Sequence, residues 1–476
     1  MKSTTPASFY SLLETKFPHT PTTTQSVALQ KLAEFTLSSI KDEVFLLKGY
    51  AGTGKTTLIG TLVNSLWKVQ KKAVLMAPTG RAAKVMSNYS NTQAFTIHRK
   101  IYFPKKQSGG GVQFVLAPNK HRDTLFIVDE ASMIPDTADS KLFENGSLLD
   151  DLMMFVYSGH KCKLLLIGDT AQLPPVHLVL SPALDADKLS LNYNKEVIQL
   201  ELNEVVRQAG DSGILANATL LREQLQGDFF DDFKFDVNPF TDIVRLIDGN
   251  EIQEAIDSSY SENGKEETAF IVRSNKRANL YNQNIRERIL FLENDIAVGD
   301  FMMVVKNNYY WLKPSSEAGF IANGDIIEVL EIFDIKEIYT FKFAEVKVKM
   351  VDYPNMAPFE TVLLLDTIAA ESPSLSYEDG NRLYQEVMKD FAHESSKYKK
   401  FLGVKNNKYF NGLQVKFSYA ITCHKSQGGQ WNTVFVEQPY LPNGIDKEYL
   451  RWLYTAVTRA KNKLYLIGFK DDFFVD

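Results

Sequence analysis

One short stretch, G-Y-A-G-T-G-K-T at residues 49–56, restricts how this chain can fold more than any other feature. A strand-like apolar run (residues 44–47) precedes it, and a helix-like run with leucines four residues apart follows it. Glycines in such a loop let the backbone wrap phosphate groups and point its N–H donors inward. The start of the following helix adds a favourable field for an anion. The pattern therefore predicts a triphosphate-binding loop made by Gly49, Ala51, Gly52, Thr53, Gly54, Lys55, Thr56 and Thr57.

Two acidic residues follow a second apolar strand, in the stretch LFIVDEASMI at residues 125–134. We expect Asp129 and the Thr56 hydroxyl to hold Mg²⁺, Lys55 to reach the outer phosphates, and Glu130 to polarise the attacking water as a general base. The alternative is a solvated acidic pair at a strand end, which the phosphate loop disfavours. The expected cofactors are ATP and Mg²⁺.

The first part of the chain alternates buried-strand runs with helical stretches. Continuous apolar runs of this length are typical of a parallel sheet covered on both faces, so we predict an α/β fold. The expected strands are Val44–Leu47, Val74–Ala77, Leu125–Val128, Leu164–Ile167 and Val197–Leu200. Residues 99–121 interrupt this pattern with two short strand-like runs around three glycines, which favours a β-hairpin over a disordered surface loop.

A second α/β pattern follows, with strands expected at Phe270–Val272, Tyr419–Thr422, Val434–Val436 and Leu464–Ile467. Between its halves, residues 299–418 contain alternating strands with polar turns, as in a small β-barrel. A helical face with Leu383, Val387 and Phe391 spaced by four comes after these strands. The pattern predicts a β-rich module with a helical elaboration, inserted into the second α/β domain.

Composition sets few further limits. At 476 residues the chain is too long for one ordinary core, and its net charge of −5 gives no sign of a nucleic-acid partner. A narrow basic groove on an acidic body remains compatible with that charge. The sequence has no apolar run that could span a bilayer and no signal-like N-terminus, and its two cysteines lie far apart. We therefore expect a cytoplasmic protein with no membrane partner.

The stretch LLLIGDTAQLPPV (residues 164–176) places Gln172 after a third strand, where an amide can sense the γ-phosphate. This stretch resembles a motif of the superfamily 1 helicases, and further segments match that family in order. They are APTGRAAKVM (77–86), AFTIH (94–98), ELNEVVRQ (201–208), SYAITCHKSQGGQW (418–431) and YTAVTRAK (454–461). The resemblance covers about Gln25 to Lys463 and is closest to the 5′-to-3′ branch, the RecD/Dda type.

The resemblance implies two RecA-like domains, with an SH3-like barrel inserted in the second. The expected bounds are 1–197 for the first domain with its hairpin at 99–121, 198–298 and 419–476 for the second domain, and 299–418 for the barrel with its helical extension. It also implies two arginines that stabilise the transition state across the interdomain cleft, Arg207 and Arg459.

The same resemblance assigns residues to the base of the nucleotide and to the nucleic acid. Gln25 matches the family's adenine-reading glutamine; a helix-capping role is its alternative. Gln430 stands where many relatives have an acidic residue, and Val206 stands where an adenine-stacking aromatic residue is expected. The track for the nucleic acid is expected to include Thr79, Arg81, Phe95, Thr96, His98, Thr422, His424, Lys425 and Ser426.

Two alternatives stay open on this track. His98 could instead be a core histidine. Tyr309, Tyr310 and Trp311 could stack on bases or fill the barrel core.

The expected function is an ATP-dependent DNA helicase that moves 5′ to 3′ on single-stranded DNA. Its partners would be single-stranded and forked duplex DNA, with a monomer as the simplest assembly. The rival hypotheses are a DNA-binding clamp with little unwinding and an unrelated P-loop kinase or GTPase. The host pathway, in DNA replication, recombination or repair, stays open, as does the role of the helical extension at 354–418.

Overall fold

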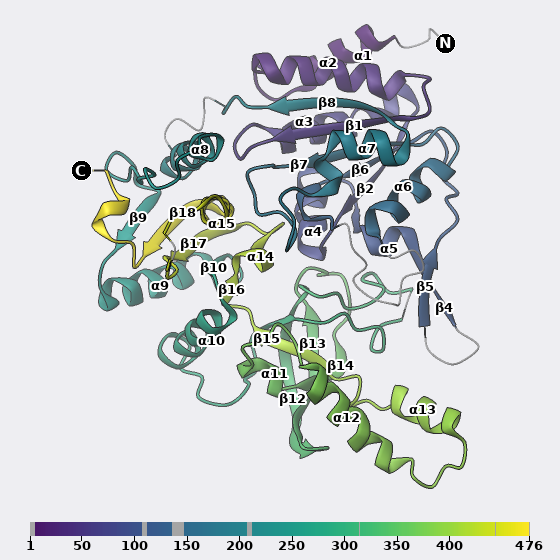
Figure 1. The fold of residues 1–476 in the computed structure, drawn as a ribbon, viewed down its shortest axis with the longest axis vertical. Helices are drawn as coiled ribbons and strands as arrows, with labels where there is room; N and C mark the ends of the chain where they lie inside the picture. The colour runs from purple at the N-terminus through teal and green to yellow at the C-terminus, as the bar shows by residue number, and fades with distance from the viewer. Residues whose placement is uncertain are drawn as a thin grey trace.

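The computed structural model describes residues 5–106, 112–135, 147–206, 212–313, 315–442 and 444–475. Figure 1 shows three parts: a sheet with its helices at the top, a second sheet at the left, and a β-barrel with projecting helices at the bottom. The predicted fold class is confirmed. None of the helices in the described part of the chain is long and apolar enough to cross a membrane.

The first sheet has six parallel strands in the order β3-β2-β6-β7-β1-β8. Val44 and Leu46 of β1 pack into a core on one face, while Phe45 and Leu47 pack into a core on the other. This explains the continuous apolar runs. The strands are β1 (Glu43–Gly49), β2 (Lys72–Ala77), β3 (Ala94–Thr96), β6 (Thr124–Val128), β7 (Lys163–Gly168) and β8 (Glu196–Leu202).

All five predicted strands of this sheet are confirmed, and one boundary needs correction. β8 pairs with β1 from Glu196 to Leu202, so residues 198–202 belong to the first sheet rather than to the second domain. The helices around the sheet are α1 (Pro6–Lys16), α2 (Thr23–Leu37), α3 (Lys55–Val63), α4 (Gly80–Ser90), α5 (Ile97–Ile101), α6 (Leu148–Ser158) and α7 (Ala186–Tyr193), with short 3₁₀ turns η1 (Leu66–Val69), η2 (Ala131–Met133) and η3 (Pro182–Leu184).

The segment after α5 forms the predicted hairpin. β4 (Tyr102–Lys106) and β5 (Val112–Leu116) are antiparallel, with Tyr102 opposite Leu116. The buried Tyr102 hydroxyl donates to Asp151 of α6 at 2.6 Å, which fixes the base of the hairpin to the first domain. The three glycines of the predicted turn lie outside the described residues.

The second sheet is also parallel, in the order β16-β10-β17-β18-β9. Its strands are β9 (Ile243–Leu246), β10 (Thr268–Val272), β16 (Ala420–Thr422), β17 (Trp431–Glu437) and β18 (Ala460–Ile467). Its helices are α8 (Gly213–Gln226), α9 (Gly249–Asn263), α10 (Asn275–Asn284), α14 (Cys423–Ser426) and α15 (Lys447–Val457), with η5 (Ile285–Ile289) and η6 (Asp471–Phe473). β10 and β16 pair although the barrel separates them in sequence.

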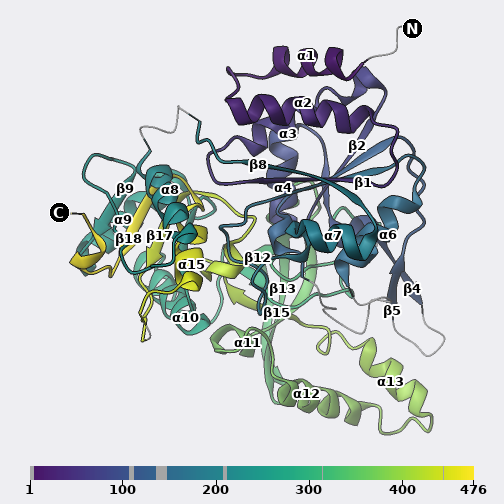
Figure 2. The same ribbon diagram turned by 45° about the horizontal axis from the view of Figure 1, so that its top comes forward.

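The inserted module is a closed five-stranded barrel, β11-β12-β13-β14-β15. Its strands are β11 (Phe301–Val304), β12 (Ile326–Ile338), β13 (Phe341–Met350), β14 (Phe359–Leu364) and β15 (Leu413–Phe417), and α11 (Asp366–Ala369), α12 (Tyr377–Asp390) and α13 (Lys397–Lys405) lie between the last two. Leu383 and Val387 of α12 are buried as predicted, whereas Phe391 caps the end of the helix. Figures 1 and 2 both show α13 on the same side as the hairpin.

Candidate nucleotide cleft and nucleic-acid pocket

The phosphate loop joins β1 to α3 in the predicted manner. Gly52 and Gly54 have positive φ angles of 74° and 82°, a conformation that favours glycine. A side chain at Gly54 would also place its Cβ 2.5 Å from the Gln25 amide nitrogen. Lys55 Nζ donates to the Gly49 carbonyl at 2.6 Å and to the Tyr50 carbonyl at 2.8 Å, so its ammonium lies within the loop.

A cleft of about 890 Å³ opens beside this loop, with walls from both α/β domains. Predicted residues that line it are Gln25, Ala51, Gly52, Gly54, Lys55, Thr56, Thr57, Asp129, Glu130, Gln172, Gln430 and Arg459. Val206 lines it as well. Thr53 is fully buried inside the loop, where its hydroxyl donates to the Tyr50 carbonyl at 2.8 Å. Arg207 lies outside the described residues.

The two acidic residues leave β6 at the floor of the cleft. Asp129 accepts hydrogen bonds from the Tyr89 hydroxyl and from the Glu130 backbone N–H, both at 2.8 Å. Glu130 has a φ of 54°, a strained conformation for a non-glycine residue. Burial raises the pKa of the Glu130 carboxyl to about 7; Arg459 opposes this rise and Asp129 adds to it.

Arg459 forms part of the opposite wall. Only 3% of its surface is exposed. Its guanidinium donates to three acceptors of its own domain: the carbonyls of Thr455 and Gly429, at 3.0 and 3.2 Å, and the Thr458 hydroxyl at 3.2 Å. These bonds hold a positive charge at the cleft, and within the described residues Arg459 forms no salt bridge, which suits a group that would meet phosphate.

Gln25 caps a helix and also contacts the phosphate loop. It exchanges hydrogen bonds with Thr22 at the start of α2, as a capping box. Its amide nitrogen also donates to the Thr53 carbonyl of the phosphate loop at 2.9 Å. The capping alternative is therefore present in the structure, and adenine reading stays a prediction.

A tyrosine that the sequence did not single out joins the two domains at the cleft. The Tyr454 hydroxyl on α15 donates to Asp169 at 2.7 Å and accepts the Ala51 N–H of the phosphate loop at 2.9 Å. The neighbouring Gln172 is buried, and within the described residues its side-chain oxygen has no hydrogen-bond donor. An unsatisfied buried acceptor beside the cleft is compatible with a ligand-sensing position.

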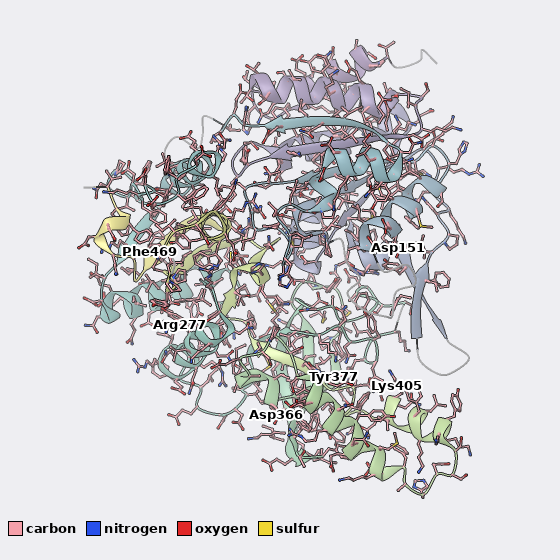
Figure 3. The ribbon with its side chains drawn as sticks, in the orientation of Figure 1. Asp151, Arg277, Asp366, Tyr377, Lys405 and Phe469 are labelled. Carbon is pink, nitrogen blue, oxygen red and sulfur yellow. The ribbon has the colours of Figure 1, made fainter. Side chains whose placement is uncertain are left out.

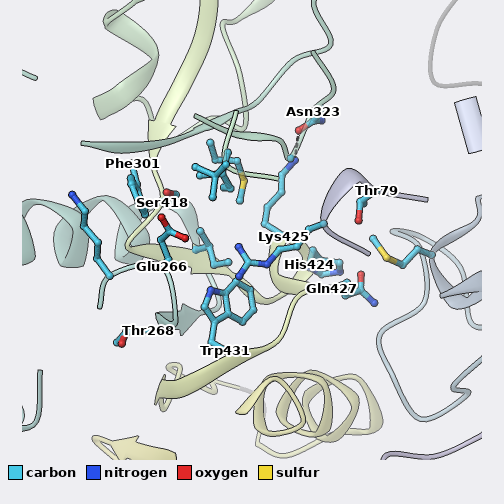
Figure 4. A pocket seen from close by; sticks show the side chains of 18 residues that line it. Thr79, Glu266, Thr268, Phe301, Asn323, Ser418, His424, Lys425, Gln427 and Trp431 are labelled. Carbon is cyan, nitrogen blue, oxygen red and sulfur yellow. Dashed lines mark hydrogen bonds between the residues drawn. The ribbon is translucent and has the colours of Figure 1, made fainter. Parts of the chain in front are cut away.

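The same loop continues to a second, smaller pocket. The Leu173 N–H donates to the Thr455 hydroxyl at 2.8 Å, and the Gln427 amide donates to the Leu173 carbonyl at 2.7 Å. Gln427 lines the second pocket, which measures about 200 Å³ and receives residues from the first domain, the second domain and the barrel (Figure 4). This loop thus lines the nucleotide cleft and is bonded to a residue that lines the second pocket.

Four predicted nucleic-acid residues line this pocket: Thr79, Arg81, His424 and Lys425. The Arg81 guanidinium lies 4.1 Å from the centre of the Trp431 ring, across the domain boundary. Lys425 donates to Asn323 of the barrel (Figure 4). Burial lowers the pKa of His424.

The other predicted residues do not line the pocket. The Thr96 hydroxyl caps α5 by accepting the Arg99 N–H, and the Phe95 ring lies beside Arg99 and Lys100. His98 lies 5.7 Å from the ring of Tyr102. Thr422 caps α14. Ser426 is fully buried and donates to the Cys423 carbonyl at 2.8 Å, so its hydroxyl does not reach the pocket in this conformation.

The barrel aromatics divide between the two roles considered for them. Tyr309 packs 4.6 Å from Phe114 of the hairpin and 4.9 Å from Phe320. The Trp311 indole donates to the Asn411 carbonyl at 2.8 Å and packs against the barrel core. Tyr310 is 40% exposed. Tyr309 and Trp311 therefore have structural roles, and of these three residues only Tyr310 offers open surface.

Together these features define the chain as a two-domain P-loop nucleotide-binding protein whose nucleotide cleft lies between the domains. Residues 33–178 match the AAA domain family, and residues 417–467 match the UvrD-like helicase C-terminal domain family. The first match contains the phosphate loop, Asp129, Glu130 and Gln172. The second contains His424, Lys425 and Arg459.

Three proteins are similar to this chain over most of its length. An uncharacterised protein of Methanocaldococcus jannaschii is 26% identical over 92% of this chain, which spans 38% of that protein. The ATP-dependent DNA helicase Dda of Enterobacteria phage T4 is 26% identical over 88% of this chain and 93% of its own length. The structure of Pif1 helicase from Bacteroides with ADP-AlF3 and single-stranded DNA is 14% identical, covers 94% of this chain and 93% of its own, and has a TM-score of 0.45. The chain is therefore similar to a phage ATP-dependent DNA helicase over most of its length, and two of its segments match the AAA and UvrD-like helicase C-terminal families.

Proposed function

We propose that the protein is an ATP-dependent DNA helicase that moves 5′ to 3′ along single-stranded DNA and unwinds duplex DNA. The phage relative that it matches over most of both chains is named as an ATP-dependent DNA helicase. The barrel inserted before residues 418–431 is the feature that supports the direction of movement, through the resemblance to the 5′-to-3′ branch.

The observation that carries this proposal is the loop from Asp169 to Leu173. Asp169 and Gln172 line the nucleotide cleft, while Leu173 is held by Gln427 of the second pocket. A change at the γ-phosphate position would therefore displace a loop that is bonded to the pocket for DNA. Such a bonded link between two sites is what a nucleotide-driven motor requires.

Phosphoryl transfer would use residues that already line the cleft. The oxygen donors of Thr56 and Asp129 suit Mg²⁺, which prefers carboxylate, hydroxyl and phosphate oxygens. When bound, the ion would neutralise charge on the phosphates. Lys55 would bind the outer phosphates, Glu130 would take the proton of the attacking water, and Arg459 would stabilise charge from across the cleft.

The DNA strand would cross the second pocket between the domains. Thr79 and Arg81 would contact it from the first domain, and His424 and Lys425 from the second. Hydroxyl and cationic groups of this kind bind phosphates without reading sequence. Closing and opening the cleft would then shift one set of contacts relative to the other.

The proposal is tested by ATP hydrolysis with and without single-stranded DNA. We expect the rate to rise strongly with DNA and to be abolished by Lys55→Ala, whereas Lys68→Ala, an exposed lysine of the same domain, should behave as the unaltered protein. Hydrolysis that DNA does not stimulate would favour an unrelated P-loop enzyme. DNA binding without hydrolysis would favour a clamp.

A further inference from the structure

A groove of about 1030 Å³ lies between the barrel and its helical extension. Its lining residues are distant in sequence from the phosphate loop. Five tyrosines, five asparagines and two lysines line it, and no aspartate or glutamate is among its described lining residues. It lies between the loop after β11, the start of α12 and the helix α13. We call it the extension groove.

Two of its tyrosines present open ring faces. Tyr377 at the start of α12 is 85% exposed, and Tyr398 on α13 is 48% exposed. Figure 3 shows Tyr377 near Lys405, which comes from the end of α13. Rings of this kind stack on unpaired bases, and that stacking tolerates any sequence.

The lysine-rich C-terminal part of the extension favours a polyanion. Residues 395–412 contain five lysines and no acidic residue, on a chain whose net charge is −5. Two of these lysines pair with carboxylates outside this range, Lys408 with Glu345 at 2.8 Å and Lys399 with Glu394 at 4.0 Å. Three of the four acidic side chains of α12 are engaged outside the groove, and the fourth, Glu378, is not among the lining residues. Asp379 pairs with Arg382 at 2.9 Å, Glu386 pairs with Lys389 at 2.6 Å, and Asp390 accepts the Tyr339 hydroxyl. The positive charge of Lys306 and Lys405 is therefore not offset within the lining.

The groove is also continuous with the hairpin. Tyr309 lines the groove, and the same ring packs 4.6 Å from Phe114 of β5. Both ribbon views place α13 on the hairpin side of the molecule (Figures 1 and 2). A strand separated at the hairpin would therefore pass close to the groove.

We propose that the extension groove binds single-stranded DNA, as a second site apart from the pocket between the domains. Tyr377 and Tyr398 stack on bases, the lysines bind phosphates, and asparagine amides bond to base edges or sugars. The identity of the ligand rests on the proposed helicase function. The strand could be either tail of a fork, and both tails share this chemistry.

The test compares the double variant Tyr377→Ala/Tyr398→Ala with Tyr440→Ala, which removes a tyrosine that is 87% exposed outside the groove. Affinity for a forked DNA with two single-stranded tails is measured by fluorescence anisotropy. Because one stacked base is worth a factor of about five or more, we expect the double variant to bind the fork at least about fivefold more weakly and the control to be unchanged. Equal affinity of all three proteins would overturn the proposal.

Two further measurements separate this inference from the proposed function. ATP hydrolysis saturated with a short single strand should be the same in the double variant and the unaltered protein, since the groove lies outside the catalytic cleft. If DNA does not stimulate hydrolysis even in the unaltered protein, the proposed function fails, while weakened fork binding would still support the groove.

Forks that lack one tail identify the bound strand, because the variant's defect disappears with that tail. A defect of the same size on blunt duplex DNA would overturn single-strand binding.

Discussion

Arg459 is the residue through which the second domain would act on the nucleotide. Its guanidinium is fixed at the cleft by three bonds within its own domain. An arginine that stabilises phosphoryl transfer from across a cleft is worth roughly 10³ or more in rate. We expect Arg459→Ala to bind ATP with a modest loss and to lower kcat by about that factor. Fluorescent-nucleotide titration and steady-state hydrolysis measure the two effects.

The matched control for this variant is Arg277→Ala, which removes a surface arginine paired with Glu437. It should leave both quantities unchanged. An Arg459→Ala protein with unaltered kcat would show that Arg459 acts on the fold and not on the phosphates.

Glu130 should give hydrolysis a pH dependence near neutrality. Burial raises the pKa of its carboxyl to about 7, and a general base must be deprotonated to act. We therefore expect kcat to fall as the pH drops below about 7 and to rise to a plateau above it. Glu130→Gln cannot ionise, so its residual rate should be low and should lack this rise. An unchanged pH profile in Glu130→Gln would assign the titration to another group.

The same pKa has a consequence for folding. A carboxyl whose pKa is higher in the folded than in the unfolded state favours folding in its protonated form. That contribution is fully present below the unfolded pKa and is lost as the pH rises through about 7.

Local pattern predicted some of these residues and could not predict others. The phosphate loop, Asp129 and Glu130 follow their strands directly, so spacing along the chain reveals them. Tyr454 meets Asp169 across 285 sequence positions, and Tyr89 meets Asp129 from a neighbouring helix. Such contacts depend on how the domains pack, which a single sequence does not encode as a local signal.

At the scale of elements, the hairpin is the structure whose role is most open to test. Its base is held by Tyr102 and Phe114, which pack in the core of the first domain and against the barrel. We expect replacement of residues 104–113 by a short Gly-Ser turn to leave DNA-stimulated hydrolysis largely intact while unwinding falls sharply. The reason is that opening each base-pair step costs about 1.4 kcal/mol, and a wedge would couple movement along the strand to that opening.

Hydrolysis and unwinding of a fork, measured side by side, test this prediction. Keeping Tyr102 and Phe114 preserves the packing of the base and serves as an internal control for folding. Normal unwinding by the shortened protein would mean that the hairpin does not separate the strands.

Elements with strong periodicity were predictable, and short edge elements were not. Four of the five predicted strands of the first sheet and the four of the second have a buried apolar run, whereas β8 lies at the edge of its sheet and is mostly not buried. β3 and β9 are three and four residues long, respectively, too short to give a clear signal. β8 extends past its predicted end because its pairing with β1 continues to Gly49. Its apolar run stops earlier, since exposed side chains alternate with partly buried ones along the strand.

At the scale of the whole molecule, the three parts are joined at the sites that would have to communicate. Tyr454 bonds the phosphate loop to the second domain, and Arg81 stacks on Trp431 across the same boundary. The barrel contacts the first domain through Lys84, which donates to the Val351 carbonyl at 3.0 Å. These contacts would let a change in the cleft move the DNA pocket and the barrel together.

The most direct measurement of the central claim is unwinding of two duplexes that differ only in their single-stranded tail. One carries a 5′ tail and the other a 3′ tail of the same length and composition, with ATP and Mg²⁺ present. The account predicts ATP-dependent unwinding of the 5′-tailed duplex and little of the 3′-tailed one, with none by Lys55→Ala. Preferential unwinding of the 3′-tailed duplex would contradict the assigned direction, and unwinding of neither would contradict the helicase function.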